Sequence, residues 1–407
     1  MTSSALGRDF RLLWSAAVSS RFGDALRTPA LALLAATVTR DPRIIAAVTV
    51  AGQVPPLLFG LLGGVYADRW DRRRTMAVVD GVRAAVVAAL AVVVALNRVS
   101  VLVLLVAAFL LATLGTLFDS ASFALLPALV PPDALPLANG RLQAGSAVAG
   151  GFLGAPAAGV LFAVAPALPF ALDAVTFAVA ALLVLALGQP PAVTPGTALR
   201  RGSVWSEIVE GLRWLRAHRT LWRVTVLTAA SNLAISGIMA VLVLYALDVL
   251  RVPPAGYGLF AAAAILGGVA GALGAGRIAT RLGTVPALRV VLAVETVALT
   301  GFALARHPVS GGIALAVFAA GTVVWNSLWA SYGQRQVPSE LLGRVGAAQR
   351  MVGLLTAPLG AALAGLAASA YGTAPVAGAA AATFALVTLA AWRTLRPTAP
   401  AVLIRAG

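Results

Sequence analysis

Three ionisable residues stand at helical spacing in the first long apolar segment of the chain. Arg21, Asp24 and Arg27 occupy positions i, i+3 and i+6 and therefore share one stripe of a helix. Asp24 lies roughly 20 Å along a helix that begins near residue 11, close to the middle of a bilayer. An ionisable group at that depth is costly and is a functional candidate by default. The stripe predicts either a group that binds a proton or substrate, with Asp24 first, or a static ion pair between helices.

Glu295 is the second candidate for proton coupling. It stands in the run VVLAVETVALTG without a charged neighbour within four residues. We expect such a carboxylate to be protonated or paired with another helix. Candidates for the lining of a cavity are charged, polar or aromatic residues of the apolar segments: Arg21, Arg27, Asn232, Trp325 and Asn326.

Other charged groups have plainer interpretations. Asp80 and Arg83 are three residues apart and are expected to pair locally near the inner end of a helix. Asp173 is expected to have a structural or gating role. The chain has no cysteine and only two histidines, both in predicted loops. No catalytic residue, metal ligand or cofactor site is therefore predicted.

The elements that must hold these residues are membrane helices. The chain is 60% hydrophobic and 11% charged over 407 residues, which is too little polar surface for a soluble protein of this length. A helix needs about 20 apolar residues to cross a bilayer. By that measure the sequence predicts twelve transmembrane helices, at residues 12–38, 44–67, 75–96, 101–126, 139–164, 168–188, 222–249, 256–276, 286–305, 309–332, 345–370 and 375–395.

The distribution of arginine sets the predicted topology. All 30 basic residues are arginine, and the net charge is +16. Twenty-two of them fall on the side that holds both termini, five on the other side and three within spans. The positive-inside rule then predicts cytoplasmic termini in a multi-pass protein of the inner (plasma) membrane. Because the charge follows the span ends, a nucleic-acid partner is not expected, and the absence of lysine excludes a P-loop.

The predicted spans divide into two sets of six. The expected domains are an N-terminal six-helix bundle at 1–188, a cytoplasmic linker at 189–221, a C-terminal bundle at 222–395 and a cytoplasmic tail at 396–407. In the linker, apolar residues from Trp205 to Leu215 recur at helical spacing, which predicts an amphipathic helix on the inner membrane face. GRIATRLG (276–283) repeats the pattern of GVYADRWD (64–71), so the bundles are expected to be pseudo-symmetric in an all-α fold.

The loop between the second and third predicted spans carries a dense group of charges, in the segment GVYADRWDRRR (64–74). Such a group cannot lie in hydrocarbon and predicts a tight hairpin at the cytoplasmic surface. The hairpin resembles the signature G-x-x-x-D-[RK]-x-G-[RK]-[RK] of the major facilitator superfamily, with Asp71 where the family usually has glycine. The matching residues are Gly64, Asp68, Arg69, Arg72 and Arg73.

This resemblance implies the major facilitator fold and a gating role for the hairpin. In similar proteins the carboxylate at Asp68 contacts the start of the eleventh span, here residues 344–346, and latches the cytoplasmic side closed. Arg72 would link to a carboxylate at the inner end of the fourth span, for which Asp119 is the candidate. The alternative is that these charges only fix the topology.

The fifth predicted span resembles one branch of that superfamily. GGFLGAPAAG (150–159) is similar to the antiporter motif GxxxGPxxGG at Gly154, Pro156 and Gly159, with Ala155 inserted. PFALDAVTF (169–177) and EGLRWLR (210–216) resemble macrolide efflux pumps and enterobactin-type siderophore exporters. The arginine that drug antiporters usually carry in the fourth span is missing.

The branch resemblance implies a monomeric secondary transporter in the lipid bilayer. It would exchange protons for a small amphipathic molecule, such as an antibiotic, drug or siderophore, by alternating access, and so contribute to efflux and multidrug resistance. The alternatives are a proton-coupled importer (symporter) of a small metabolite on the same fold, or a non-transporting membrane sensor. An enzyme is not expected, because no pairing of a nucleophile with a base is recognisable.

Overall fold

The computed structural model describes residues 7–59, 71–131, 134–188, 204–338 and 341–395. Every regular element in these ranges is a helix, as the all-α prediction requires. Eleven helices of the described residues are long and apolar enough to cross a membrane. The 31-residue α1 is also long enough but carries the charged stripe in its middle. Together these helices account for the twelve predicted spans.

The N-terminal half contains the helices before the linker. The predicted fifth span is built from α6, a π-helical segment η2 and α7, which follow one another without a loop. The helices of this half are α1 (Arg8–Val38), α2 (Pro42–Phe59), α4 (Arg72–Ala95), α5 (Val101–Leu129), α6 (Leu135–Ala147), η2 (Val148–Gly154), α7 (Ala155–Val164) and α8 (Leu168–Leu185).

The C-terminal half begins with the linker helix α9. Its first spanning helix, α10, ends in a second π-helical segment, η3. The helices of this half are α9 (Val204–Ala217), α10 (Arg219–Leu244), η3 (Tyr245–Val249), α11 (Pro254–Leu282), α12 (Thr284–Leu304), α13 (Pro308–Gln336), α14 (Leu342–Tyr371) and α15 (Thr373–Thr394).

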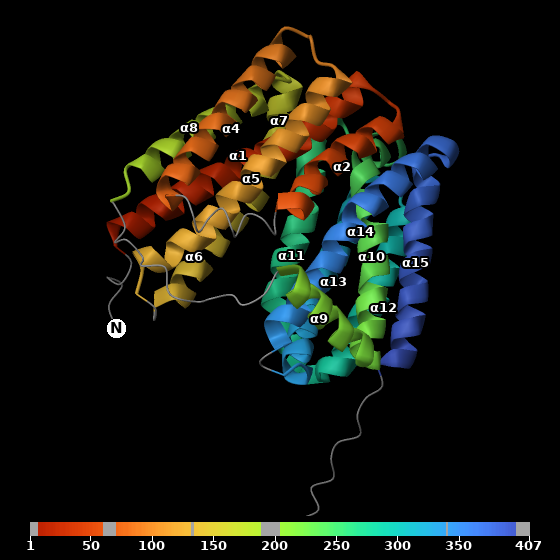
Figure 1. Ribbon diagram of the computed structural model, residues 1–407. Coiled ribbons are helices and arrows are strands. Elements are labelled where there is room, and N and C mark those ends of the chain that lie inside the picture. Colours follow the sequence, from red (N-terminus) through yellow and green to blue (C-terminus); the bar gives the residue numbers. More distant parts are fainter. Residues whose placement is uncertain (1–6, 60–70, 132–133, 189–203, 339–340, 396–407) are drawn as a thin grey trace, which may run out of the picture.

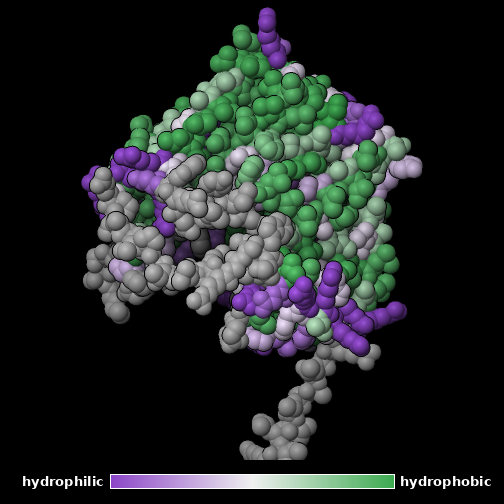
Figure 2. All heavy atoms as spheres, viewed as in Figure 1, coloured by the Kyte–Doolittle hydropathy of each residue, from purple (hydrophilic) through white to green (hydrophobic). Residues whose placement is uncertain are grey.

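Successive spanning helices run in opposite directions, so the molecule has two ends. We call the end that holds the start of α1 and the helix α9 the linker end, and the opposite end, with the connection from α1 to α2, the far end. Hydrophobic side chains cover the middle of both halves and hydrophilic ones gather near their ends (Figure 2). This distribution is the one expected of a protein whose helices cross a bilayer.

The two halves approach each other closely at the far end. A Cβ atom on Gly159 of α7 would lie 2.6 Å from the carbonyl oxygen of Ala255 in α11, and one on Gly258 would lie 2.9 Å from the amide nitrogen of Gly159. Only glycine permits this approach of the two backbones. Arg40 and Asp248 add an ion pair of 3.0 Å across the same end. Toward the linker end the halves diverge (Figure 1).

The apolar face of the linker helix α9 packs against the protein. Ile208 and Leu215 are 6% and 0% exposed. Leu215 packs in a hydrophobic cluster with Val337 and Val345 of the C-terminal half. The prediction of a helix was confirmed. Its apolar face packs on the apolar surface that the ends of α13 and α14 offer, and its position at the inner membrane face stays a prediction. Arg344 of α14 also pairs with Glu210 of α9 at 2.6 Å.

Candidate functional site

A network of buried charges joins α1, α4 and α8 in the middle of the N-terminal half. Arg83 of α4 is its centre and is 2% exposed. One terminal nitrogen of Arg83 donates to Asp24 Oδ1 at 2.6 Å. The other donates to Asp80 Oδ1 at 3.2 Å and to Ser20 Oγ at 3.0 Å. The face of its guanidinium lies over the ring of Phe177, 3.9 Å from the ring centre.

Arg27 extends the network toward α8. It donates to Asp24 Oδ1, and its Nε lies 3.2 Å from Asp173 Oδ2. The side chain of Asp173 is fully buried, and Asp24 is 22% exposed. Asp24 therefore bonds closely to two guanidinium groups and has a third, that of Arg21, at 4.0 Å. It is the member of the buried carboxylates that solvent reaches.

Arg21 lies on the more exposed side of the same stripe. Its Nη2 donates to Asp119 Oδ1 of α5 at 2.6 Å, and the two side chains are 45% and 53% exposed. The predicted link between Arg72 and Asp119 stays a prediction. Arg21 is thus the α1 partner of Asp119 that the sequence did not identify.

The buried part of the network contains more carboxylates than guanidinium groups. Arg27 and Arg83 face the three carboxylates of Asp24, Asp80 and Asp173. Among the residues that the structure describes, Asp80 Oδ2 is buried without a hydrogen-bond partner, and Asp173 Oδ2 has its ion-pair contact with Arg27 but no hydrogen bond. An uncompensated charge in a low-dielectric interior costs several kcal/mol. One added positive charge would balance the group.

A cavity of about 500 Å³ lies between the two halves next to this network. Helices α1, α2 and α5 form one wall, and α10, α11 and α13 form the other. Arg27 reaches it from the charge network, and Thr28, Thr49 and Tyr257 supply hydroxyl groups. The remaining lining is almost entirely apolar. This composition is typical of a site for a small molecule with a large apolar part and few polar groups.

Three of the other predicted cavity residues, Asn232, Trp325 and Asn326, occupy a separate chamber, whereas Arg21 lines neither space. Glu295, Asn232, Trp325 and Asn326 line a space of about 70 Å³ inside the C-terminal half. Thr322 of α13 donates to Glu295 Oε1 at 3.0 Å. The expectation that Glu295 pairs with another helix is met by this contact. These residues do not line the cavity between the halves. The sequence predicted a single cavity, whereas the structure distributes the predicted residues over two separate spaces.

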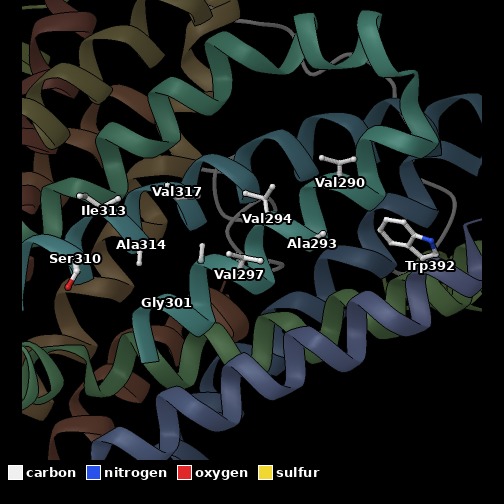
Figure 3. Close-up of a pocket in the computed structure, with 11 residues that line it drawn as sticks. Val290, Ala293, Val294, Val297, Gly301, Ser310, Ile313, Ala314, Val317 and Trp392 are labelled. Carbon is white, nitrogen blue, oxygen red and sulfur yellow. The ribbon is translucent and has the colours of Figure 1, made fainter. Parts of the chain in front are cut away.

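An apolar groove lies on the outside of the C-terminal half. Figure 3 shows valine side chains of α12 along it, with Trp392 of α15 at one end. Val297 and Ile313, on α12 and α13, are 72% and 60% exposed. The groove opens away from the other half, so we assign it to the lipid-facing surface rather than to a transport route.

The fifth-span motif shapes the path of the chain between α6 and α7. Gly154 ends the π-helical segment η2, and Pro156 stands in the first turn of α7, where its missing amide is tolerated. Gly159 makes the close far-end contact with α11. The motif therefore sets both a change of helix type and a contact between the halves.

The charged hairpin is described only in part. Gly64, Asp68 and Arg69 lie outside the described residues. Asp71 caps α4, because its side chain accepts hydrogen bonds from the backbone amides of Arg73 and Arg74. This cap accounts for an aspartate where the family usually has glycine. Arg73 in turn donates to the carbonyl oxygens of Val184, at 3.2 Å, and Leu185, at the end of α8.

Arg83 and Asp80 are the functional candidates that sequence reasoning missed. Their predicted pairing was confirmed, but the sequence placed them near the end of the helix and gave them no partner outside it. Arg83 is eleven residues into α4, or about 17 Å from its start. That depth is the signal that could have marked it, since an arginine near the middle of a span needs a partner on another helix.

Comparison with known proteins identifies the family. The sequence profile of the Major Facilitator Superfamily matches residues 13–361. The chain belongs to this superfamily, whose members are membrane transporters and are generally not enzymes. No curated protein sequence matches the chain.

Solved structures share the fold at low sequence identity. A bacterial homolog of the human lysosomal transporter Spinster, inward-facing and occupied, has a TM-score of 0.74 and 13% identity, and covers 97% of both chains. The nucleoside transporter NupG has a TM-score of 0.73 and 15% identity, covering 96% of this chain and 100% of its own. A bacterial homologue of the iron transporter ferroportin, inward-facing, has a TM-score of 0.73 and 15% identity, covering 95% and 98%. The outward-facing structure of that homologue gives 0.57 and 17% identity, covering 95% and 99%.

Proposed function

We propose that this protein is a proton-coupled exporter that exchanges protons for a small amphipathic molecule. The observation that carries the proposal is the surplus carboxylate of the buried network, placed beside the cavity between the halves. Arg27 belongs to both, so its charge connects the state of the network to whatever occupies the cavity. A change of charge on one side then alters binding on the other.

In this proposal Asp24 is the carboxylate through which the proton enters. It is 22% exposed, whereas Asp80 and Asp173 are fully buried. A proton on Asp24 would weaken its bonds to Arg27 and Arg83 and leave the remaining buried charges balanced. Arg27 would then be released to reorganise the cavity wall. A static ion-pair role for Asp24 is the alternative.

We further propose that the linker end is cytoplasmic and that the conformation described here is inward-facing. The arginine distribution supports the orientation. The close contacts at the far end and the divergence at the linker end support the state, as does the higher TM-score to the inward-facing ferroportin homologue than to the outward-facing one. Closure of the linker end would use the latch of Asp68 and Arg72, with the two halves rocking about the cavity. Binding shifts this equilibrium only by its differential affinity for the two states.

The proposed direction and substrate class rest on different observations. The apolar lining and the volume of about 500 Å³ favour a small molecule with a hydrophobic body. Export in place of import rests on the resemblance of the fifth span and of two other segments, residues 169–177 and 210–216, to the efflux branch. We propose a monomer in the inner (plasma) membrane with both termini in the cytoplasm.

The test uses inverted membrane vesicles with an acidic interior. Macrolides, tetracyclines, dyes and siderophores are added one at a time, and the internal pH is followed. We expect a substrate to release internal protons, and Asp24→Asn to abolish that release while the protein still reaches the membrane. Asp41→Asn, an exposed carboxylate at the far end paired with Arg43, is the matched control and should behave as the wild type.

Two outcomes would contradict the proposal. Normal proton release by Asp24→Asn would remove Asp24 from the coupling mechanism. Uptake of a substrate into intact cells, driven by an inward proton gradient, would establish the importer instead of the exporter.

A further inference from the structure

We infer that the chamber around Glu295 is a binding site for one monovalent cation of the sodium type. The chamber lies within the C-terminal half, between α10, α12, α13 and α15, and contains no residue of the N-terminal charge network. It is therefore a second site, distinct from both the cavity and the proposed proton entry at Asp24.

Oxygen ligands from three helices line the chamber. Three oxygen-bearing side chains come from successive turns of α10, namely Thr228, Ser231 and Asn232. Glu295 of α12 and Thr322 and Asn326 of α13 face them across the chamber. Hard cations prefer carboxylate, hydroxyl and amide oxygens of this kind.

Hydroxyl oxygens in the chamber keep free lone pairs. The hydroxyl of Ser231 donates to the carbonyl oxygen of Leu227 at 3.1 Å. The hydroxyl of Thr322 has two acceptors, Glu295 Oε1 at 3.0 Å and the carbonyl oxygen of Phe318 at 3.2 Å. The remaining lone pairs of these two hydroxyl oxygens can accept a hydrogen bond or bind a cation. Thr228 Oγ1 is buried and has no hydrogen-bond partner among the described residues. Each of these hydroxyl oxygens keeps a lone pair with which it can coordinate a cation.

The chamber contains one carboxylate, that of Glu295. Glu295 is 3% exposed and forms no ion pair with an arginine of the described residues. One carboxylate is balanced by one monovalent ion, whereas a divalent ion would leave a net positive charge in a low-dielectric interior. The volume of about 70 Å³ holds such an ion with a few waters, since about 10–15 Å³ suffices for one water.

The neighbouring helix is shaped to hold Glu295 in place. A Cβ atom on Gly321 of α13 would lie 2.6 Å from Glu295 Cγ, so the stem of the glutamate packs directly on the backbone of α13. Phe318, Trp325 and Phe384 close the chamber on its apolar side. A bound cation would thus join α10, α12 and α13, and would stabilise the C-terminal half by mass action.

The test is binding of radioactive sodium to the purified full-length protein in detergent, at fixed pH and ionic strength, with choline replacing sodium. We expect saturable binding of one ion per chain, and a rise of the unfolding temperature with sodium concentration. Glu295→Gln should abolish both effects. Thr228→Val, which keeps the shape of the side chain, should weaken binding at least about tenfold without loss of folded protein.

Asp24→Asn separates this inference from the proposed function, because it should bind sodium as the wild type does. Absence of saturable binding by the wild type would overturn the inference, including the case in which only protons bind. Binding that persists in Glu295→Gln would overturn it as well. Failure of Glu295→Gln to fold would leave Thr228→Val to decide, and unchanged affinity in that variant would refute the site.

Discussion

Replacing Arg83 with methionine tests whether the buried carboxylates depend on Arg83 for their stability, as their ion pairs indicate. The substitution keeps the long apolar stem but removes the guanidinium that binds Asp24 at 2.6 Å and Asp80 at 3.2 Å. Both carboxylates lose a partner in a buried setting. Removing one member of a buried ion pair costs about 3–5 kcal/mol of unfolding free energy. The lost contact with the face of Phe177 adds up to about 2 kcal/mol.

The compensated double variant gives the sharper expectation. Arg83 is the one ion-pair partner that the described residues supply to Asp80. In the Arg83→Met background, Asp80→Asn therefore removes a carboxylate that has become unpaired. The buried group returns to a surplus of one carboxylate. We expect the double variant to be more stable than Arg83→Met alone, with a coupling free energy of roughly 0.5–3 kcal/mol.

The assay is unfolding in mixed micelles with increasing sodium dodecyl sulfate, followed by tryptophan fluorescence. Four proteins complete the cycle: the wild type, both single variants and the double variant. The control cycle uses Arg43→Met and Asp41→Asn, a more exposed pair with an Nη2–Oδ2 distance of 2.8 Å, and should show a coupling of at most about 1 kcal/mol. If the effects of Arg83→Met and Asp80→Asn simply add, the two residues are independent and the account of the network is wrong.

Two further predictions concern contacts outside the network. Gly159→Ala should force α7 and α11 apart at the far end, since its Cβ would lie 2.6 Å from a carbonyl oxygen. Overpacking would destabilise the closed far end by about 1–3 kcal/mol. The ratio of the outward-facing to the inward-facing state would then rise by roughly 5- to 150-fold. Because the chain has no cysteine, maleimide labelling of Thr49→Cys from outside the cell reports this shift. The control is Gly378→Ala, whose added Cβ meets no atom within 4 Å. Unchanged labelling in Gly159→Ala contradicts the prediction. Tyr245→Phe should cost about 1 kcal/mol, because the buried hydroxyl donates to the carbonyl oxygen of Phe302 at 2.8 Å; an unaltered unfolding midpoint would show that this bond is replaced by another.

The sequence predicted the helices well because hydrophobic length is a local property. Each spanning helix must satisfy its own backbone hydrogen bonds within the bilayer, so a run of apolar residues is sufficient to identify it. The same locality made Asp80 and Arg83 visible as a pair three residues apart. It could not show that Asp24, 59 positions earlier in the chain than Arg83, bonds to the same guanidinium.

The linker helix is a second case in which the sequence alone does not decide the packing. Its amphipathic spacing predicts a helix with one apolar face, and a bilayer or a protein surface satisfies that face equally. Leu215 packs on the ends of α13 and α14 because those helices happen to end beside it. No property of residues 204–217 alone distinguishes the two cases.

The sequence by itself determined the number and placement of the helices, the membrane setting and the superfamily, since these follow from hydropathy, charge distribution and a short contiguous motif. Only the tertiary structure decided which polar residues work together. Arg27 joins the network and the cavity, while Asn232, Asn326 and Glu295 belong to a chamber elsewhere. The physical reason is that the rotation and packing of each helix depend on all of its neighbours. The role of a buried charge therefore depends on the groups that surround it.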